Sequence, residues 1–198
     1  MSPFELVFAL CGLLLGLAIS EVLGGFSRAV KLRRSASQVR IGWLTPLLGL
    51  FVILDLTSFW IMVYDARSQL VANELTLVAV LAVVGTYYIA ATLIFPDDPE
   101  EWRDFDQHYD RQNRMVVAGL LAANLGSAIG LIILEEIVPT PAAEMPSDAD
   151  IAVAGMVGIS ILLLLIALIF VKGRRKNVAI LATCIGLLLG GAVAEALV

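Results

Sequence analysis

Asp55 is the residue whose type and position most clearly offer chemistry, because it interrupts a long apolar stretch at residues 41–64. An ionisable side chain is costly in hydrocarbon and usually faces protein or water, where it binds a proton, an ion or a polar group. At about 1.5 Å per helical residue, Asp55 lies about 21 Å from one end of the stretch and about 14 Å from the other. We therefore expect a carboxyl group near the middle of a membrane.

Further polar side chains are expected at the depth of Asp55. Ser58 follows it by three residues and shares its helical face. The same count along two other apolar stretches adds four residues: Thr86, Tyr87, Tyr88 and Asn124. We interpret this set as a site that binds or passes a proton, a small ion or a small polar solute.

The alternative interpretation of Asp55 is structural. In that case a neutral carboxyl group is hydrogen-bonded to Tyr, Asn or Ser side chains across helices. No Lys or Arg lies within any of the apolar stretches to neutralise a purely structural carboxylate. We therefore favour the binding interpretation.

Other reactive residue types are scarce in this sequence. His108 is the only histidine, whereas a metal site normally needs three or four ligands, so we expect no metal site. Cys11 and Cys184 lie within apolar stretches, and no Cys-x-x-Cys motif occurs. Nucleophile elbows, phosphate-binding glycine loops and zinc-protease motifs are also missing. We expect no catalytic residues, no cofactor and no enzymatic activity.

Six apolar stretches must position these side chains. Hydrophobic residues make up 60% of the chain and charged residues 16%, a composition too apolar for a soluble domain to cover with polar surface. Each stretch is long enough to cross a hydrocarbon core of about 30 Å. The expected spans are residues 4–26, 41–64, 75–95, 115–138, 151–171 and 178–197. The fold class is therefore all-α: residues 1–198 form one polytopic bundle of six transmembrane helices in a lipid bilayer.

The basic residues indicate the orientation of the bundle. Apart from Arg67, every Lys and Arg falls in the first, third or fifth loop or in the helix ends beside it. Basic residues near helix ends are retained on the cytoplasmic side, which predicts that both termini lie outside. We expect a bacterial-type inner membrane as the location. The net charge of −5 gives no indication of a nucleic-acid partner.

The third loop, residues 96–114, is long and acidic. Trp102, Phe105 and Tyr109 recur at spacings of three and four residues, which places them on one helical face. We expect a short amphipathic helix that lies along the cytoplasmic interface and continues into the fourth span. It is either a docking or gating element or a tether that sets helix tilt, and we favour the tether.

Small residues at intervals of four make smooth strips along which helices can approach closely. The glycines of these strips are Gly12, Gly16, Gly126, Gly130, Gly186 and Gly190. They predict tight packing within the bundle, with a second copy or with another membrane protein. The second functional hypothesis is therefore a non-catalytic scaffold or accessory subunit. A cavity reaching Asp55 would favour the first hypothesis, and a filled core with exposed glycine strips would favour the second.

Overall fold

A computed structural model of the protein describes residues 3–34, 39–71, 73–97, 104–141 and 147–196. Six long helices make up most of these residues, and all six are long and apolar enough to cross a membrane. They are α1 (Pro3–Arg34), α2 (Leu44–Asp65), α3 (Glu74–Thr92), α4 (Phe105–Ile137), α5 (Asp148–Phe170) and α6 (Arg174–Ala196). A short 3-10 helix, η1 (Ala66–Ser68), follows α2. The prediction of an all-α, six-helix membrane bundle is confirmed.

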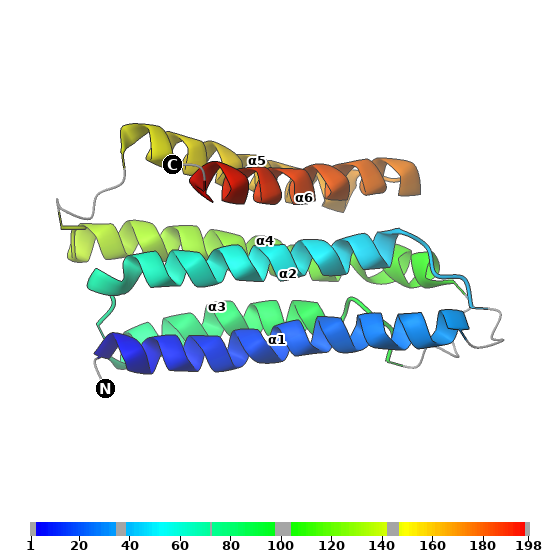
Figure 1. Cartoon of the computed structure of the whole chain (residues 1–198), viewed down its shortest axis with the longest axis horizontal. Coiled ribbons are helices and arrows are strands. Elements are labelled where there is room, and N and C mark those ends of the chain that lie inside the picture. Colours follow the sequence, from blue (N-terminus) through cyan, green and yellow to red (C-terminus); the bar gives the residue numbers. More distant parts are fainter. Residues whose placement is uncertain (1–2, 35–38, 72, 98–103, 142–146, 197–198) are drawn as a thin grey trace.

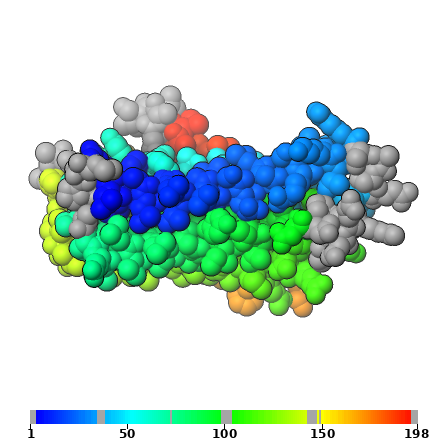
Figure 2. Space-filling view, turned by 90° about the horizontal axis from the view of Figure 1, so that it is seen from below, coloured from blue at the N-terminus to red at the C-terminus, as the bar shows by residue number. Residues whose placement is uncertain are grey.

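The helices run lengthwise beside one another in three neighbouring pairs: α1 with α3, α2 with α4, and α5 with α6 (Figure 1). Helix α2 is central, since it contacts α1, α3, α4 and α6. Figure 2 shows α1, in blue, packed along its length against the α3–α4 region, in green. A side chain on the inner face of α2 is therefore surrounded by several helices.

The connections alternate between the two ends of the bundle (Figure 1). The described ends of the chain, at Pro3 and Ala196, lie at one end with the α2–α3 and α4–α5 connections. The other three connections lie at the opposite end, which we call the basic end because it carries the loops rich in Lys and Arg. This arrangement agrees with the predicted threading of the chain. The assignment of the basic end to the cytoplasm stays a prediction.

Two helices, α1 and α4, extend furthest beyond the apolar stretches predicted for them, by eight and ten residues, both at the basic end. Helix α1 continues to Arg34, and its last turn carries Lys31, Arg33 and Arg34, which interact favourably with the negative end of the helix dipole. Helix α4 already begins at Phe105, because the Asp104 side chain caps it by accepting a hydrogen bond from the Asp106 amide at 2.9 Å. Polar helical turns therefore project past the hydrocarbon region here.

The aromatic residues of the third loop differ from the expected interfacial helix. Phe105 and Tyr109 are only 1% and 2% exposed, and they pack into the hydrophobic core. The Phe105 backbone is held on both sides, since its amide donates to the Arg40 carbonyl and its carbonyl accepts from the Thr45 hydroxyl, each at 3.0 Å. These hydrogen bonds orient the start of α4 so that it faces protein rather than lipid. Trp102 lies outside the described residues.

Candidate functional site

Asp55 occupies the middle of the central helix. It lies eleven residues after Leu44 and ten before Asp65, the first and last residues of α2, which places it about 15 Å from either end of the helix. The side chain is 4% exposed and faces the bundle interior. The carboxyl group is therefore central in α2, and its depth in a membrane stays a prediction.

Asn124 joins the Asp55 carboxylate to α4. Its Nδ2 atom lies 2.9 Å from Asp55 Oδ2, 3.1 Å from Tyr87 Oη and 3.0 Å from the Leu120 carbonyl oxygen. The Tyr87 hydroxyl is also hydrogen-bonded to the Asp55 side chain. Three helices, α2, α3 and α4, thus contribute one polar side chain each to a single network, which we call the Asp55 network: Asp55, Tyr87 and Asn124.

The hydrogen bonds of this network cannot all form at once. An amide NH₂ group has two hydrogens, whereas Asn124 Nδ2 has three acceptors within 3.1 Å. At any moment, one of the three acceptors therefore receives no hydrogen from Asn124. The network has more than one arrangement of protons, and the protonation of Asp55 would decide between them.

Apolar groups and a thiol surround the Asp55 network. The Phe59 ring lies 5.6 Å from the Tyr87 ring, centroid to centroid. Cys184 of α6 is buried close enough to Asp55 to interact with it electrostatically. Because no Lys or Arg occurs within the apolar stretches, the described partners of Asp55 are all neutral. The carboxylate form would place an uncompensated charge in a region of low dielectric.

The structure does not bring the other three predicted residues into this network. Ser58 is exposed on the outer side of α2, and Tyr88 is 39% exposed. The Thr86 hydroxyl donates to the Ala82 carbonyl of its own helix at 2.7 Å. The position of a residue along a helix therefore does not say which way its side chain turns.

The predicted glycine strips have mixed surroundings. A Cβ atom on Gly12 would lie 2.5 Å from the Trp60 ring, and one on Gly126 would lie 3.4 Å from Val83, so these glycines face other helices. The other four have nothing within 4 Å of that position: Gly16, Gly130, Gly186 and Gly190. Among the described residues, the strip of Gly186 and Gly190 is thus open at both glycines, whereas the strips on α1 and α4 are each open at one glycine only.

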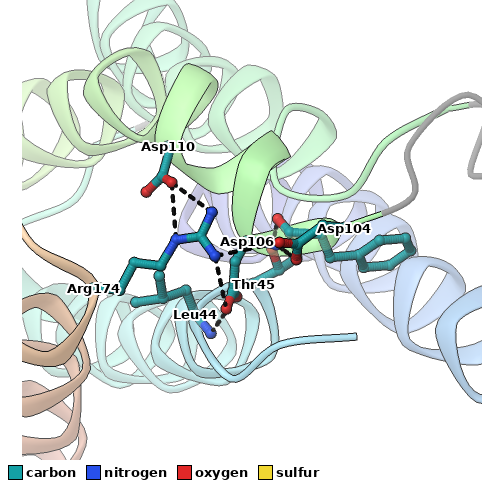
Figure 3. Close-up of polar contacts among 7 residues, drawn as sticks. Leu44, Thr45, Asp104, Asp106, Asp110 and Arg174 are labelled. Carbon is teal, nitrogen blue, oxygen red and sulfur yellow. Dashed lines mark hydrogen bonds and ion pairs between the residues drawn. The ribbon is translucent and has the colours of Figure 1, made fainter. Parts of the chain in front are cut away.

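A second polar cluster, which the sequence did not reveal, lies at the basic end (Figure 3). The Arg174 guanidinium group forms ion pairs with Asp110 at 2.8 Å, Asp104 at 3.2 Å and Asp106 at 3.9 Å. Asp106 also accepts a hydrogen bond from the Leu44 amide at 3.3 Å. We call these four charged residues the Arg174 cluster. It ties the first turns of α2, α4 and α6 together.

The Arg174 cluster links three helices through ion pairs and is not arranged as a metal site. The guanidinium group occupies the space between the three carboxylates that a metal ion would need (Figure 3). His108 lies nearby on α4, with Nε2 3.2 Å from the Leu93 carbonyl oxygen. Within the described ranges, no group of three or more His, Cys, Asp and Glu side chains has the geometry to hold a metal.

Comparison of the chain with protein families, with curated proteins and with solved structures finds no match.

Proposed function

We propose that this multi-pass membrane protein binds a proton at Asp55 and passes it, or a solute coupled to it, between the two sides of the membrane. The observation that carries the proposal is the Asp55 network: a carboxyl group, 4% exposed, at mid-helix with only neutral described partners from two other helices. Proton binding removes the charge that makes such a position costly.

The orientation of Asn124 favours a proton over a metal cation. Its amide nitrogen, a donor, faces the Asp55 carboxylate at 2.9 Å. A donor group at that place repels a cation such as Na⁺, which would need the amide oxygen instead. When Asp55 carries a proton, its hydroxyl can donate to Tyr87, and the amide hydrogens can turn to Tyr87 and Leu120.

Because the three members of the network belong to three helices, a change in its hydrogen bonds acts on how these helices contact one another. Interhelical hydrogen bonds in membranes contribute about 0.6 kcal/mol on average and up to about 1.7 kcal/mol. Exchange of one or two such bonds is enough to shift the balance between two helix arrangements of similar free energy. The proposed role of Asp55 is thus to couple proton binding to helix position.

Proton flux into proteoliposomes tests this proposal. The purified protein would be reconstituted with a pH-sensitive dye inside the vesicles, and an outside acid pulse would be applied. We expect flux above that of empty vesicles, and its loss in Asp55→Asn. The matched control is Asp65→Asn, since Asp65 is an exposed carboxylate at the end of the same helix. Equal flux in the two variants would refute the proposed passage.

The open glycine strip of α6 favours a second candidate function, assembly with a second copy or another membrane protein. Gly186 and Gly190 of α6 have no neighbouring atoms within 4 Å of an added Cβ, so the side chains of Gly186→Leu and Gly190→Leu would begin on an open side of the helix. If this strip mediates association, the variants will shift the protein toward smaller species in single-molecule photobleaching in lipid bilayers. Unchanged oligomer size would exclude assembly through this face.

A further inference from the structure

A polar pocket lies at the basic end of the bundle, apart from Asp55. Its volume is about 510 Å³, and it is bordered by the first turns of α4, the end of α5 and the start of α6. Its lining includes four basic side chains, Arg111, Arg114, Lys172 and Arg174, against one acidic side chain, Asp110. The pocket thus has a surplus of positive charge at the level where lipid headgroups would surround the helices.

The basic residues of the pocket differ in their surroundings. Arg174 is already shared among three carboxylates of the Arg174 cluster. Arg114 and Lys172 are exposed residues on either side of the pocket, one on α4 and one in the α5–α6 turn. They are placed to contact an anion from two directions.

The start of α6 adds backbone donors to the pocket. Gly173, which lines it, has a φ of +129°, a backbone conformation that favours glycine, and its carbonyl accepts the first helical hydrogen bond, from the Asn177 amide at 3.1 Å. Glycine at this position has no side chain to accept hydrogen bonds from the amides of the first turn. Such amides, together with the helix dipole, form a favourable environment for a phosphate group.

Asn177 provides an independent indication that the pocket takes a ligand. Its side chain lines the pocket, is 3% exposed and is hydrogen-bonded to the Tyr109 side chain, whereas its Oδ1 atom has no hydrogen-bond donor among the described residues. A buried acceptor without a donor costs free energy. A ligand that carries a hydroxyl group beside its phosphate would supply the donor.

The apolar part of the lining indicates where the rest of such a ligand would lie. Ile169 and Val171 border the pocket at the end of α5, and Phe170 between them is 74% exposed on the outer surface. A headgroup in the pocket can therefore continue into acyl chains along α5. We propose that this pocket binds the phosphate group of an anionic, hydroxyl-bearing phospholipid headgroup from the adjoining leaflet.

Lipid binding by the purified full-length protein tests the proposal, with phosphatidylglycerol and phosphatidylcholine compared by native mass spectrometry and inorganic phosphate titrated separately. We expect phosphatidylglycerol to bind more tightly than phosphatidylcholine. The double variant Arg114→Gln/Lys172→Gln removes two charges, each worth about fivefold in affinity, so binding should weaken about 25-fold. The control is Lys31→Gln/Arg33→Gln, which removes two exposed charges of α1 at the same end.

The results of this experiment distinguish lipid binding in the pocket from binding elsewhere. Loss of phosphatidylglycerol binding in the pocket variant but not in the control supports the proposal. If the pocket variant also loses the binding of inorganic phosphate, free phosphate is a second ligand that supplies the same phosphate group to the pocket. Equal affinity for the two lipids, or equal losses in pocket and control variants, would overturn the proposal. If the double variant melts early without lipid, Arg114→Gln and Lys172→Gln separately carry the comparison, each with about a fivefold effect.

Discussion

The Nδ2 atom of Asn124 lies 2.9 Å from Asp55 Oδ2, which joins two residues 69 positions apart across the contact between α4 and α2. This hydrogen bond connects two helices of the same central pair (Figure 1). It makes the middle of the bundle polar at one point and joins the central helix to α4.

A double-mutant cycle should detect the Asp55–Asn124 hydrogen bond as a coupling. Asp55→Leu and Asn124→Leu each leave a polar partner unsatisfied, and each should lower the free energy of unfolding by about 1 to 2 kcal/mol. The double variant should lose less than the sum, with a coupling of about 1 kcal/mol. Unfolding in mixed micelles would measure these values.

The control for this cycle pairs Asp55→Leu with Ser160→Ala. The Ser160 hydroxyl donates to the Met156 carbonyl within α5 at 2.7 Å, so it has no share in the Asp55 network. The two effects should add within about 0.5 kcal/mol. Additivity of the Asp55 and Asn124 substitutions as well would show that the hydrogen bond contributes nothing to the stability of the bundle.

Two glycines one turn apart on α1 should respond in opposite ways to alanine. Gly12→Ala would place a Cβ atom 2.5 Å from the Trp60 ring, and the required shift of that ring should cost about 1 kcal/mol of stability. Gly16→Ala meets nothing within 4 Å and should be neutral, or stabilise by up to about 1 kcal/mol through helix propensity. Thermal unfolding in detergent would compare them, and the same effect at both positions would contradict the described packing of α1 against α2.

The fold and the site differ in how far the sequence predicts them. Hydropathy correctly predicts six helices, because a span needs a long apolar stretch, and it places Asp55, Tyr87 and Asn124 at similar depth. It does not predict helix rotation, so Ser58 and Tyr88 were expected inside although they are exposed. Hydropathy alone also misses polar helix turns, such as those of α4 that carry Asp106 and Asp110, although the aromatic spacing of the third loop predicts a helix that continues into the fourth span.

The Arg174 cluster shows a further limit of sequence analysis. Arg174 and its partner Asp110 are 64 residues apart, and no spacing rule connects residues from separate loops. The spacing of the aromatic residues in the third loop predicts an amphipathic segment, and it says nothing about the partners of the acidic residues beside them. Only the meeting of three helix starts at one end of the bundle brings these charges together (Figure 3).

Arg174→Gln should destabilise the basic end of the bundle and reduce the response of the melting temperature to salt. The Arg174 side chain is 41% exposed, so the loss should not exceed about 1 kcal/mol. In the unsubstituted protein, the melting temperature should fall between low and high salt because ion pairs are screened, and the variant should show a smaller fall. Arg175→Gln, an exposed neighbour outside the cluster, is the control. A full salt response in Arg174→Gln would exclude a stabilising role for the cluster.

Labelling of single introduced cysteines should separate the two ends of α5. Pro141 lies before α5, and Lys172 lies after it. The variants Pro141→Cys and Lys172→Cys should therefore react with a membrane-impermeant maleimide from opposite sides of the membrane. We expect Lys172→Cys to react from the cytoplasmic side. The native Cys11 and Cys184 are 1% and 0% exposed and should give little background. Reaction of both introduced thiols from one side would invalidate the threading of the chain, and with it the depth of Asp55.

Infrared difference spectroscopy of the protein in lipid, recorded across a pH titration, tests the central claim that Asp55 binds a proton. We predict a carbonyl stretching band of a protonated carboxylic acid that changes with pH, is absent in Asp55→Asn, and is retained in Asp65→Asn. If the band is missing from the unsubstituted protein, or if it persists unchanged in Asp55→Asn, Asp55 is not the proton-binding group.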